Sequence, residues 1–67
     1  MIVINGERSD ACAGESIAAV LARLDVAPNA RGVAVAVDGE VVPRARWQSF
    51  ALPEHARVEV LTAMQGG

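Results

Sequence analysis

The sequence predicts an α+β fold in which one main helix packs on one face of a mixed sheet of four to five strands. Three observations lead to this prediction. Asn5-Gly6 and Asp38-Gly39 each separate two runs of β-forming residues, and such pairs favour two-residue hairpin turns with positive φ. Between the two hairpins, apolar residues recur with the spacing of an amphipathic helix. The last segment alternates apolar and polar side chains, as a half-buried strand does.

The first hairpin is expected to pair residues 1–4 with residues 7–12. The first run is apolar and the second combines polar and small side chains, which is typical of a strand near a sheet edge. Ser16 is then the expected N-cap of the helix. Pro28 and Asn29 are expected to end it. The apolar stripe of this helix consists of Ile17, Val20, Leu21 and Leu24.

The second hairpin is expected to pair residues 33–37 with residues 40–42. Valines occupy one face of its first strand and alanines the other, and the small alanines are expected to let the helix pack closely. Pro43 cannot donate a ladder hydrogen bond, which places the returning strand at an edge. Trp47 is expected on a short helical turn, where its ring closes one end of the small core. Residues 57–62 are expected to form the last strand.

A hairpin on each side of one helix, closed by a final strand, is the pattern of a β-grasp (ubiquitin-like) fold. One helix must cover one face of one sheet in order to bury its apolar stripe. In that arrangement the last strand pairs with the first in the middle of the sheet, so the C-terminal residues leave from a rigid support. The expected organisation is a domain of residues 1–62 followed by a flexible tail of residues 63–67.

The composition narrows the class of function. A chain of 67 residues forms one domain with a small core, which favours a carrier, adaptor or binding module over an enzyme. The net charge is −2 and the arginines are scattered, so nucleic-acid binding is disfavoured. No apolar run approaches the roughly 20 residues of a membrane span, and the N-terminus lacks the features of a signal peptide. We therefore expect a cytoplasmic protein that is a monomer when free.

The reactive side chains inside the domain form no convincing site. Cys12 is a candidate for carrying sulfur as a persulfide, although a lone cysteine on a strand is more often a buried small hydrophobic residue. Asp10, Glu15 and Glu40 are candidate acid-base carboxylates, and solvated surface charge is the simpler interpretation. His55 is expected to be an exposed loop residue. The sequence therefore predicts neither catalytic residues nor a metal site.

The C-terminal tail carries the functional prediction. It follows the last expected strand directly and ends in Gly66-Gly67. Because glycine has no Cβ, such a tail can enter a slot too narrow for side chains. The terminal carboxylate is ionised at neutral pH and must be activated before it can act as an acyl donor, most simply by ATP-dependent adenylation. The alternative is that the two glycines are a disordered stub.

Three motifs occur together in this chain: the run Val37-Asp38-Gly39-Glu40-Val41-Val42-Pro43-Arg44 followed by Trp47, the strand segment Val58-Glu59-Val60, and the terminal Gly66-Gly67. Together they resemble the sulfur-carrier proteins of thiamine biosynthesis, the ThiS family, and the likeness covers essentially the whole chain. One departure is His55-Ala56, which stands where the family usually has Gly-Asp. That turn often needs positive φ, so its conformation is the part of the chain expected to differ.

The resemblance implies a mechanism and a set of partners. An E1-like adenylyltransferase (ThiF) would use Mg-ATP to convert the Gly67 carboxylate into an acyl adenylate. A cysteine desulfurase would supply sulfur for a Gly67 thiocarboxylate, and thiazole synthase (ThiG) would draw that sulfur into the thiazole ring. Gly66, Gln65 and Met64 would be recognised with the tail, and exposed parts of the sheet around the last strand would form the partner surface. The protein would be a cosubstrate that binds no cofactor itself.

Three other functions are compatible with the residues. The small subunit of molybdopterin synthase is also a β-grasp sulfur carrier that ends in Gly-Gly, but it is usually longer. A ubiquitin-like modifier would join its terminal glycine to lysines on target proteins. A plain binding module would lend a sheet edge to its partner, and removal of Gly67 would then have no effect.

Overall fold

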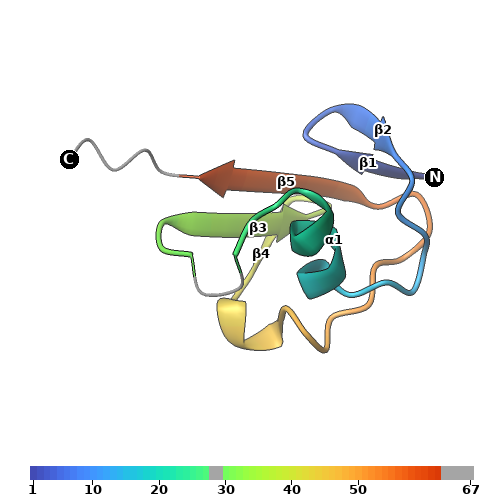
Figure 1. The fold of residues 1–67 in the computed structure, drawn as a ribbon. Coiled ribbons are helices and arrows are strands. Elements are labelled where there is room, and N and C mark those ends of the chain that lie inside the picture. Colours follow the sequence, from blue (N-terminus) through green and yellow to red (C-terminus); the bar gives the residue numbers. More distant parts are fainter. Residues whose placement is uncertain (28–29, 63–67) are drawn as a thin grey trace.

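The computed structural model describes residues 1–27 and 30–62. It shows a five-stranded sheet with the strand order β2-β1-β5-β3-β4, and the helix lies on one face of that sheet (Figure 1). β1 and β5 are parallel, whereas the other neighbours are antiparallel. The predicted mixed β-grasp sheet is thus confirmed. The elements are β1 (Ile2–Ile4), β2 (Glu7–Ser9), α1 (Ile17–Arg23), β3 (Val33–Val37), β4 (Glu40–Val42), the 3-10 helix η1 (Arg44–Arg46) and β5 (Arg57–Thr62).

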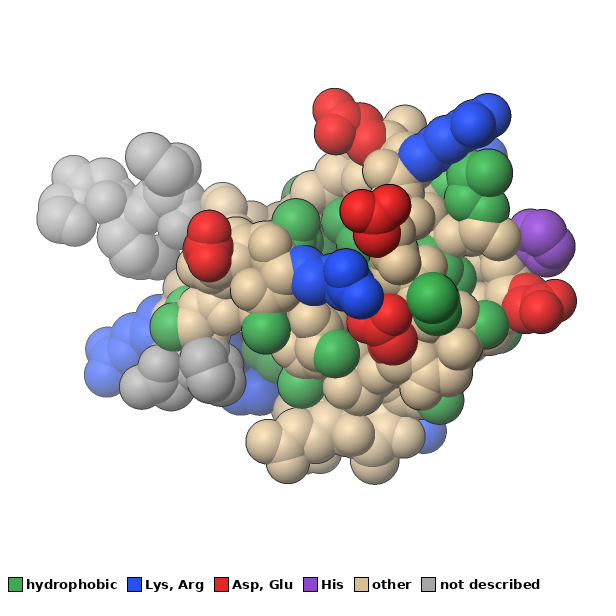
Figure 2. Space-filling view, turned by 45° about the vertical axis from the view of Figure 1, so that its right-hand side comes forward, with side chains coloured by type: hydrophobic (Ala, Val, Ile, Leu, Met, Phe, Trp, Pro, Cys, Tyr) green, Lys and Arg blue, Asp and Glu red, His purple; other side chains and the backbone are tan. Residues whose placement is uncertain are grey.

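Charged side chains stay on the surface of the domain. Among the described residues no charged or polar side chain is buried, and Figure 2 shows acidic and basic side chains interspersed over the face it presents. The surface drawn there has no large area of a single charge, in agreement with the scattered charges of the sequence. The fold therefore depends on apolar packing and on backbone hydrogen bonds rather than on buried ion pairs.

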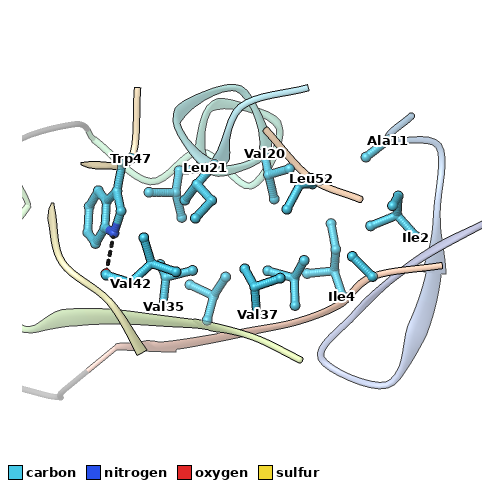
Figure 3. Packing of buried hydrophobic residues seen from close by; sticks show 14 residues of the cluster. Ile2, Ile4, Ala11, Val20, Leu21, Val35, Val37, Val42, Trp47 and Leu52 are labelled. Carbon is cyan, nitrogen blue, oxygen red and sulfur yellow. Dashed lines mark hydrogen bonds between the residues drawn. The ribbon is translucent and has the colours of Figure 1, made fainter. Parts of the chain in front are cut away.

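The core lies between α1 and the valine face of β3. Ile17 and Val20 of the helix are fully buried, and Val35 and Val37 of the strand face them in the same cluster. The expectation that the helix packs on the alanine face of β3 is therefore wrong, because the larger valines bury more apolar surface against the helix. Trp47 closes one end of this layer, and Ala11 lies near Ile2 at the other end (Figure 3).

Both hairpin turns have the predicted conformation. Asn5 and Gly6 have φ of 51° and 82°, and Asp38 and Gly39 have φ of 51° and 86°. β2 ends at Ser9, earlier than predicted. The Ser9 hydroxyl accepts a hydrogen bond from the Ala11 amide at 3.0 Å, which turns the chain away from the sheet.

The helix begins as predicted but ends earlier. The Ser16 hydroxyl accepts a hydrogen bond from the Ala19 amide at 3.1 Å, as an N-cap does. The helix stops at Arg23, because Asp25 adopts a positive φ of 59° and its amide donates to the Ala22 carbonyl. Leu24 is therefore the C-cap and is 41% exposed, so its assignment to the buried stripe was wrong.

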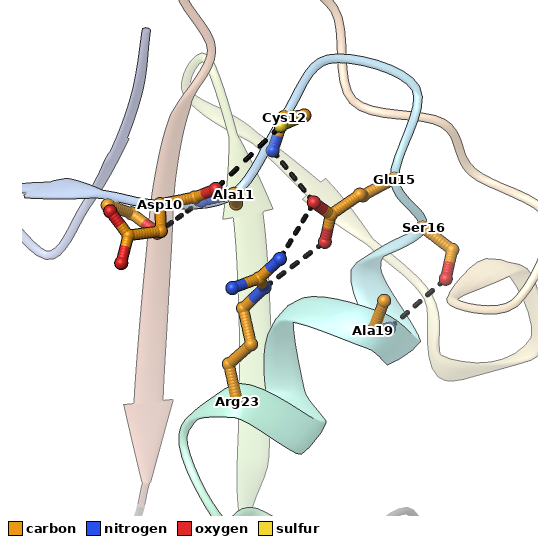
Figure 4. Close-up of polar contacts among 8 residues, drawn as sticks. Asp10, Ala11, Cys12, Glu15, Ser16, Ala19 and Arg23 are labelled. Carbon is orange, nitrogen blue, oxygen red and sulfur yellow. Dashed lines mark hydrogen bonds and ion pairs between the residues drawn. The ribbon is translucent and has the colours of Figure 1, made fainter.

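Glu15 joins the loop after β2 to the helix (Figure 4). Its carboxylate accepts hydrogen bonds from the Cys12 amide at 2.9 Å and from two guanidinium nitrogens of Arg23, at 2.9 and 3.2 Å. The hydrogen bonds from Arg23 and then from the Cys12 amide hold the pKa of the Glu15 carboxyl below its usual value. The ionised carboxylate is thus the form that stabilises this loop.

The two hairpin turns also hold β5 in place. The Asn5 side chain accepts a hydrogen bond from the Val60 amide at 2.8 Å and donates one to the Val60 carbonyl at 3.3 Å. The Asp38 carboxylate accepts a hydrogen bond from the Arg57 amide at 2.9 Å, and its own amide donates to the Arg57 carbonyl. These contacts satisfy β5 backbone groups on the side where the neighbouring strand has ended, which is β1 beside Val60 and β3 beside Arg57.

We expect Asn5→Gly to lower the free energy of unfolding by about 1–3 kcal/mol, because glycine keeps the turn but leaves the partly buried Val60 amide and carbonyl without partners. Asp38→Gly is the matched control, since it has the same place in the other turn and its side chain makes one exposed hydrogen bond to β5. Urea titration should show a smaller loss for the control. Equal losses for the two variants would contradict the special role of Asn5.

We expect Glu15→Gln to make the free energy of unfolding depend less on pH in the acid range. The folded pKa of Glu15 lies below its unfolded value, so its contribution is complete above the unfolded pKa of about 4.3 and is lost as the pH falls through the folded pKa. The difference between wild type and variant should be largest near neutral pH and shrink below about pH 4. Thermal melts between neutral and acid pH measure this difference. Glu54→Gln, at an exposed carboxylate of the connector, is the control.

Candidate functional site

The predicted site residues Met64, Gln65, Gly66 and Gly67 lie outside the described residues. The structure describes the strand to which they are joined. β5 lies between β1 and β3, and its last residue, Thr62, pairs with Val33 at the start of β3 (Figure 1). The tail therefore starts from the end of a strand that has hydrogen-bonded neighbours on both sides.

The two faces of β5 differ in chemistry. Val58 and Val60 point into the core and are 1% and 7% exposed. Leu61, on the opposite face, is 67% exposed and lies beside Ala34 of β3. Further along the same face, Ala36 pairs with Val41, which is 74% exposed. We call Leu61, Ala34, Ala36 and Val41 the outer-face strip.

The outer-face strip adjoins the base of the tail. Leu61 directly precedes Thr62, and the helix covers the other face of the sheet, so nothing in the described part of the chain lies over the strip. An exposed apolar strip of this kind is chemically suited to contact another protein. The sequence pattern indicated that Leu61 faces away from the core, but the neighbourhood of Leu61, Ala34 and Val41 follows only from the strand register.

Trp47 has the structural role predicted for it. The indole is 4% exposed, and its Nε1–H donates a hydrogen bond to the Val42 carbonyl at 2.9 Å (Figure 3). The guanidinium of Arg44 lies over the ring, 4.6 Å from its centroid. A groove of about 390 Å³ opens beside this pair, between α1 and η1. Its lining is mainly apolar, with alanines from both helices.

Cys12 is exposed rather than buried on a strand, which corrects the expectation from the sequence. It lies in the loop after β2, and its sulfur is 3.8 Å from the Asp10 carbonyl (Figure 4). β2 ends opposite Ile2, at the start of β1, whereas the tail leaves from the other end of the parallel strand β5. The thiol is therefore remote from the base of the tail.

The remaining candidate side chains form no reactive cluster. Asp10 and Glu40 are exposed, and within residues 1–27 and 30–62 there is no group of three histidine, cysteine or acidic residues that could hold a metal ion. None of the helices in that part of the chain is long and apolar enough to cross a membrane. Glu15 has the structural role described above. The described domain thus offers no internal constellation for acid-base or metal chemistry.

The turn before β5 accommodates the departure from the family pattern. His55 is exposed and takes the positive φ of 62°, and its Nδ1 is 3.3 Å from the amino group of Met1. Histidine enters this region more readily than most residues, although less readily than glycine. Ala56 is fully buried and follows directly. The chain therefore forms the turn with residues that the usual pattern does not contain.

Comparison with known proteins agrees with the observed fold. The model of the ThiS family matches residues 2–67. The chain is similar to a crystal structure of the thiamine biosynthesis protein ThiS from Geobacter metallireducens, with 29% identity and a TM-score of 0.74, over 98% of this chain and 97% of that chain. A solution NMR structure of a thiamine biosynthesis protein from the same organism has 29% identity and a TM-score of 0.75, over 98% and 86% of the two chains. No protein with a curated description matches.

The family match runs from the first strand to the last glycine, and the similarity to the two solved structures covers 98% of this chain. The resemblance found from the sequence motifs is thereby confirmed. The chain belongs to the ThiS family.

Proposed function

We propose that this ThiS-family protein is a sulfur carrier of thiamine biosynthesis, and that it carries the sulfur as a thiocarboxylate on Gly67. The observation that carries the proposal is the family match, which extends through residue 67. The structural similarity to thiamine biosynthesis proteins supports it. So does the position of the tail directly after a central, clamped strand.

The proposed chemistry has three steps. An E1-like adenylyltransferase binds Mg-ATP, and the Gly67 carboxylate attacks the α-phosphorus, so that an acyl adenylate forms and pyrophosphate leaves. The outer sulfur of a persulfide on the cysteine desulfurase then attacks the carbonyl carbon and AMP leaves; a thiol reduces the resulting acyl disulfide, so that the thiocarboxylate is released and a new disulfide forms. Thiazole synthase finally takes the sulfur from the thiocarboxylate into the thiazole ring. The metal and the nucleotide belong to the adenylyltransferase, and the carrier supplies only the acyl group.

The length and composition of the tail allow several enzymes to reach its terminal carboxyl group. Five residues follow Thr62, and an extended chain of that length spans at most about 18 Å. The last two residues have no Cβ, so the Gly67 carboxylate can approach the α-phosphorus, and its carbonyl carbon is then open to attack by sulfur. Because the tail starts from a strand within the sheet and ends in two glycines, a partner can recognise the domain while only the glycines enter its active site.

We further propose that the adenylyltransferase binds the outer-face strip. The strip is continuous with the residue that precedes the tail, so a partner that holds the tail lies against Leu61. Leu61, Val41 and Ala34 are exposed in the free protein and Ala36 is partly exposed, and burying these side chains in a complex is favourable. The helix side of the molecule faces away from this contact.

We expect a variant that lacks Gly67 to lose at least about 100-fold in adenylation, because the terminal carboxylate no longer reaches the α-phosphate. The assay incubates the protein with adenylyltransferase, Mg-ATP, cysteine desulfurase and cysteine. Intact mass should show one oxygen-to-sulfur exchange in the wild type, and fragmentation should place it at Gly67. Fragmentation is needed because oxidation of Met64 or Cys12 adds nearly the same nominal mass.

An unmodified terminus in the presence of demonstrably active partner enzymes would sink the carrier proposal. Transfer of the sulfur to molybdopterin synthase partners, and not to thiazole synthase, would keep the chemistry but change the pathway. Full activity of the variant without Gly67 would favour a binding module that works through its sheet.

We expect Leu61→Ser to raise the KM of the carrier for the adenylyltransferase about 10-fold, because losing the burial of a leucine side chain costs about 1.5 kcal/mol, and about 1.4 kcal/mol corresponds to a factor of ten. Leu24→Ser is the matched control, because Leu24 is also exposed but caps the helix away from the strip. Steady-state pyrophosphate release measures both. A control that loses as much as Leu61→Ser would show that the strip is not the contact surface.

A further inference from the structure

The basic residues of this chain are of one kind. All six positions counted as lysine or arginine are arginines, so the chain contains no lysine side chain. Three of these arginines make contacts that use the planar guanidinium. Arg23 binds both oxygens of Glu15, Arg44 lies over the ring of Trp47, and Arg46 lies over the ring of Phe50. Lysine would reproduce these contacts poorly.

At the other three positions no contact of this kind explains why arginine is present rather than lysine. Arg8, Arg31 and Arg57 are exposed, and within the described part of the chain their side chains make no hydrogen bond, ion pair or ring contact. A lysine would supply the same charge at these positions without breaking any such interaction. The absence of lysine at these three positions therefore points to a cost that lies outside the folding of the domain.

The proposed activation of Gly67 creates such a cost. An acyl adenylate reacts with a neutral primary amine: a C–N bond forms at the Gly67 carbonyl carbon, the C–O bond to AMP breaks, and AMP and a proton leave. Lysine has a pKa near 10.4 and supplies a reactive amine fraction at neutral pH. Arginine stays protonated and delocalised, so it is not a nucleophile there.

The geometry places one arginine within reach of the activated terminus. Val33 pairs with Thr62, and Arg31 precedes Val33 by two residues, so its Cα lies within about 12 Å of Thr62. A tail that spans up to about 18 Å can bring the Gly67 carbonyl to a side chain at residue 31. Once the tail leaves the adenylyltransferase, a lysine at that position would close a ring with the adenylate of its own chain.

The amino group of Met1 lies on the other side of the molecule. Val3 pairs with Arg57 in the parallel ladder, so Met1 lies beyond the start of β5 (Figure 1). Its amino group contacts His55 in the turn before that strand. At about 3.3 Å per residue, the distance to Thr62 is roughly 20 Å, more than the extended tail can span. The fold thus keeps this primary amine away from the tail as well.

We propose that the lysine-free surface protects the activated carboxyl group from aminolysis by the carrier itself, so that the adenylate persists until sulfur arrives. This inference rests on the proposed function. The surface thus offers no side-chain primary amine as a nucleophile, and residue 31 is the position where a lysine would do most harm.

The test uses Arg31→Lys with Arg57→Lys as the matched variant. Both replace an exposed arginine, but Arg57 lies five residues from Thr62 along β5, about 17 Å away, so the tail would have to fold back fully extended to reach it. Each protein, at about 10 μM, is incubated with adenylyltransferase and Mg-ATP without a sulfur source. Pyrophosphate release reports activation, and intact mass with fragmentation reports amide formation. Wild type with added methylamine shows that the adenylate accepts an amine.

Arg31→Lys should give a cyclised carrier that is lighter by one water, with a rate that does not depend on carrier concentration. Arg57→Lys should give mainly intermolecular amide, on the order of 100-fold more slowly, because a short tether supplies a millimolar effective concentration. Wild type should give neither product. Arg31→Lys that releases pyrophosphate at the wild-type rate and forms no more amide than wild type would overturn the inference. Wild type that releases no pyrophosphate would overturn the proposed function, and the inference with it.

Discussion

The structure depends on how β5 is held in the middle of the sheet. The strand pairs with β1 on one side and with β3 on the other, so it joins two hairpins that otherwise have few contacts. At each hairpin turn the side chain of the first residue with positive φ makes a hydrogen bond to the backbone of β5. Asn5 binds the Val60 amide and carbonyl, and Asp38 binds the Arg57 amide. The two turns therefore do more than reverse the chain, because they satisfy backbone groups of the strand that carries the tail.

This arrangement separates two tasks along one strand. The inward side chains Val58 and Val60 anchor β5 in the core, whereas Leu61 on the outer face is available for a partner. The residues after Thr62 end in two glycines, which two enzymes can bind one after the other. A carrier needs no catalytic groups of its own, since the nucleotide, the metal and the sulfur donor all belong to its proposed partners. The use of arginine in place of lysine protects the activated terminus in our proposal, because the surface offers it no side-chain amine.

Local chemistry made much of the fold predictable. The turns at Asn5 and Asp38, the N-cap at Ser16 and the indole of Trp47 each follow from a residue and its immediate neighbours. The errors arose where distant segments decide the outcome. The helix packs on the valine face of β3, and Asp25 ends the helix in a conformation that usually calls for glycine. The outer-face strip depends on strand register, and the exposure of Cys12 depends on Glu15 holding its loop, so neither follows from a periodic pattern.

The central claim is that Gly67 delivers sulfur to the thiazole ring, and a single-turnover isotope transfer tests it most directly. The carrier would be charged with sulfur from isotopically labelled cysteine, purified, and mixed with thiazole synthase and its other substrates in the absence of free cysteine. The account predicts that label leaves Gly67 and appears in the thiazole in equal amount. Thiazole that forms without label, while the label stays on Gly67, would contradict it.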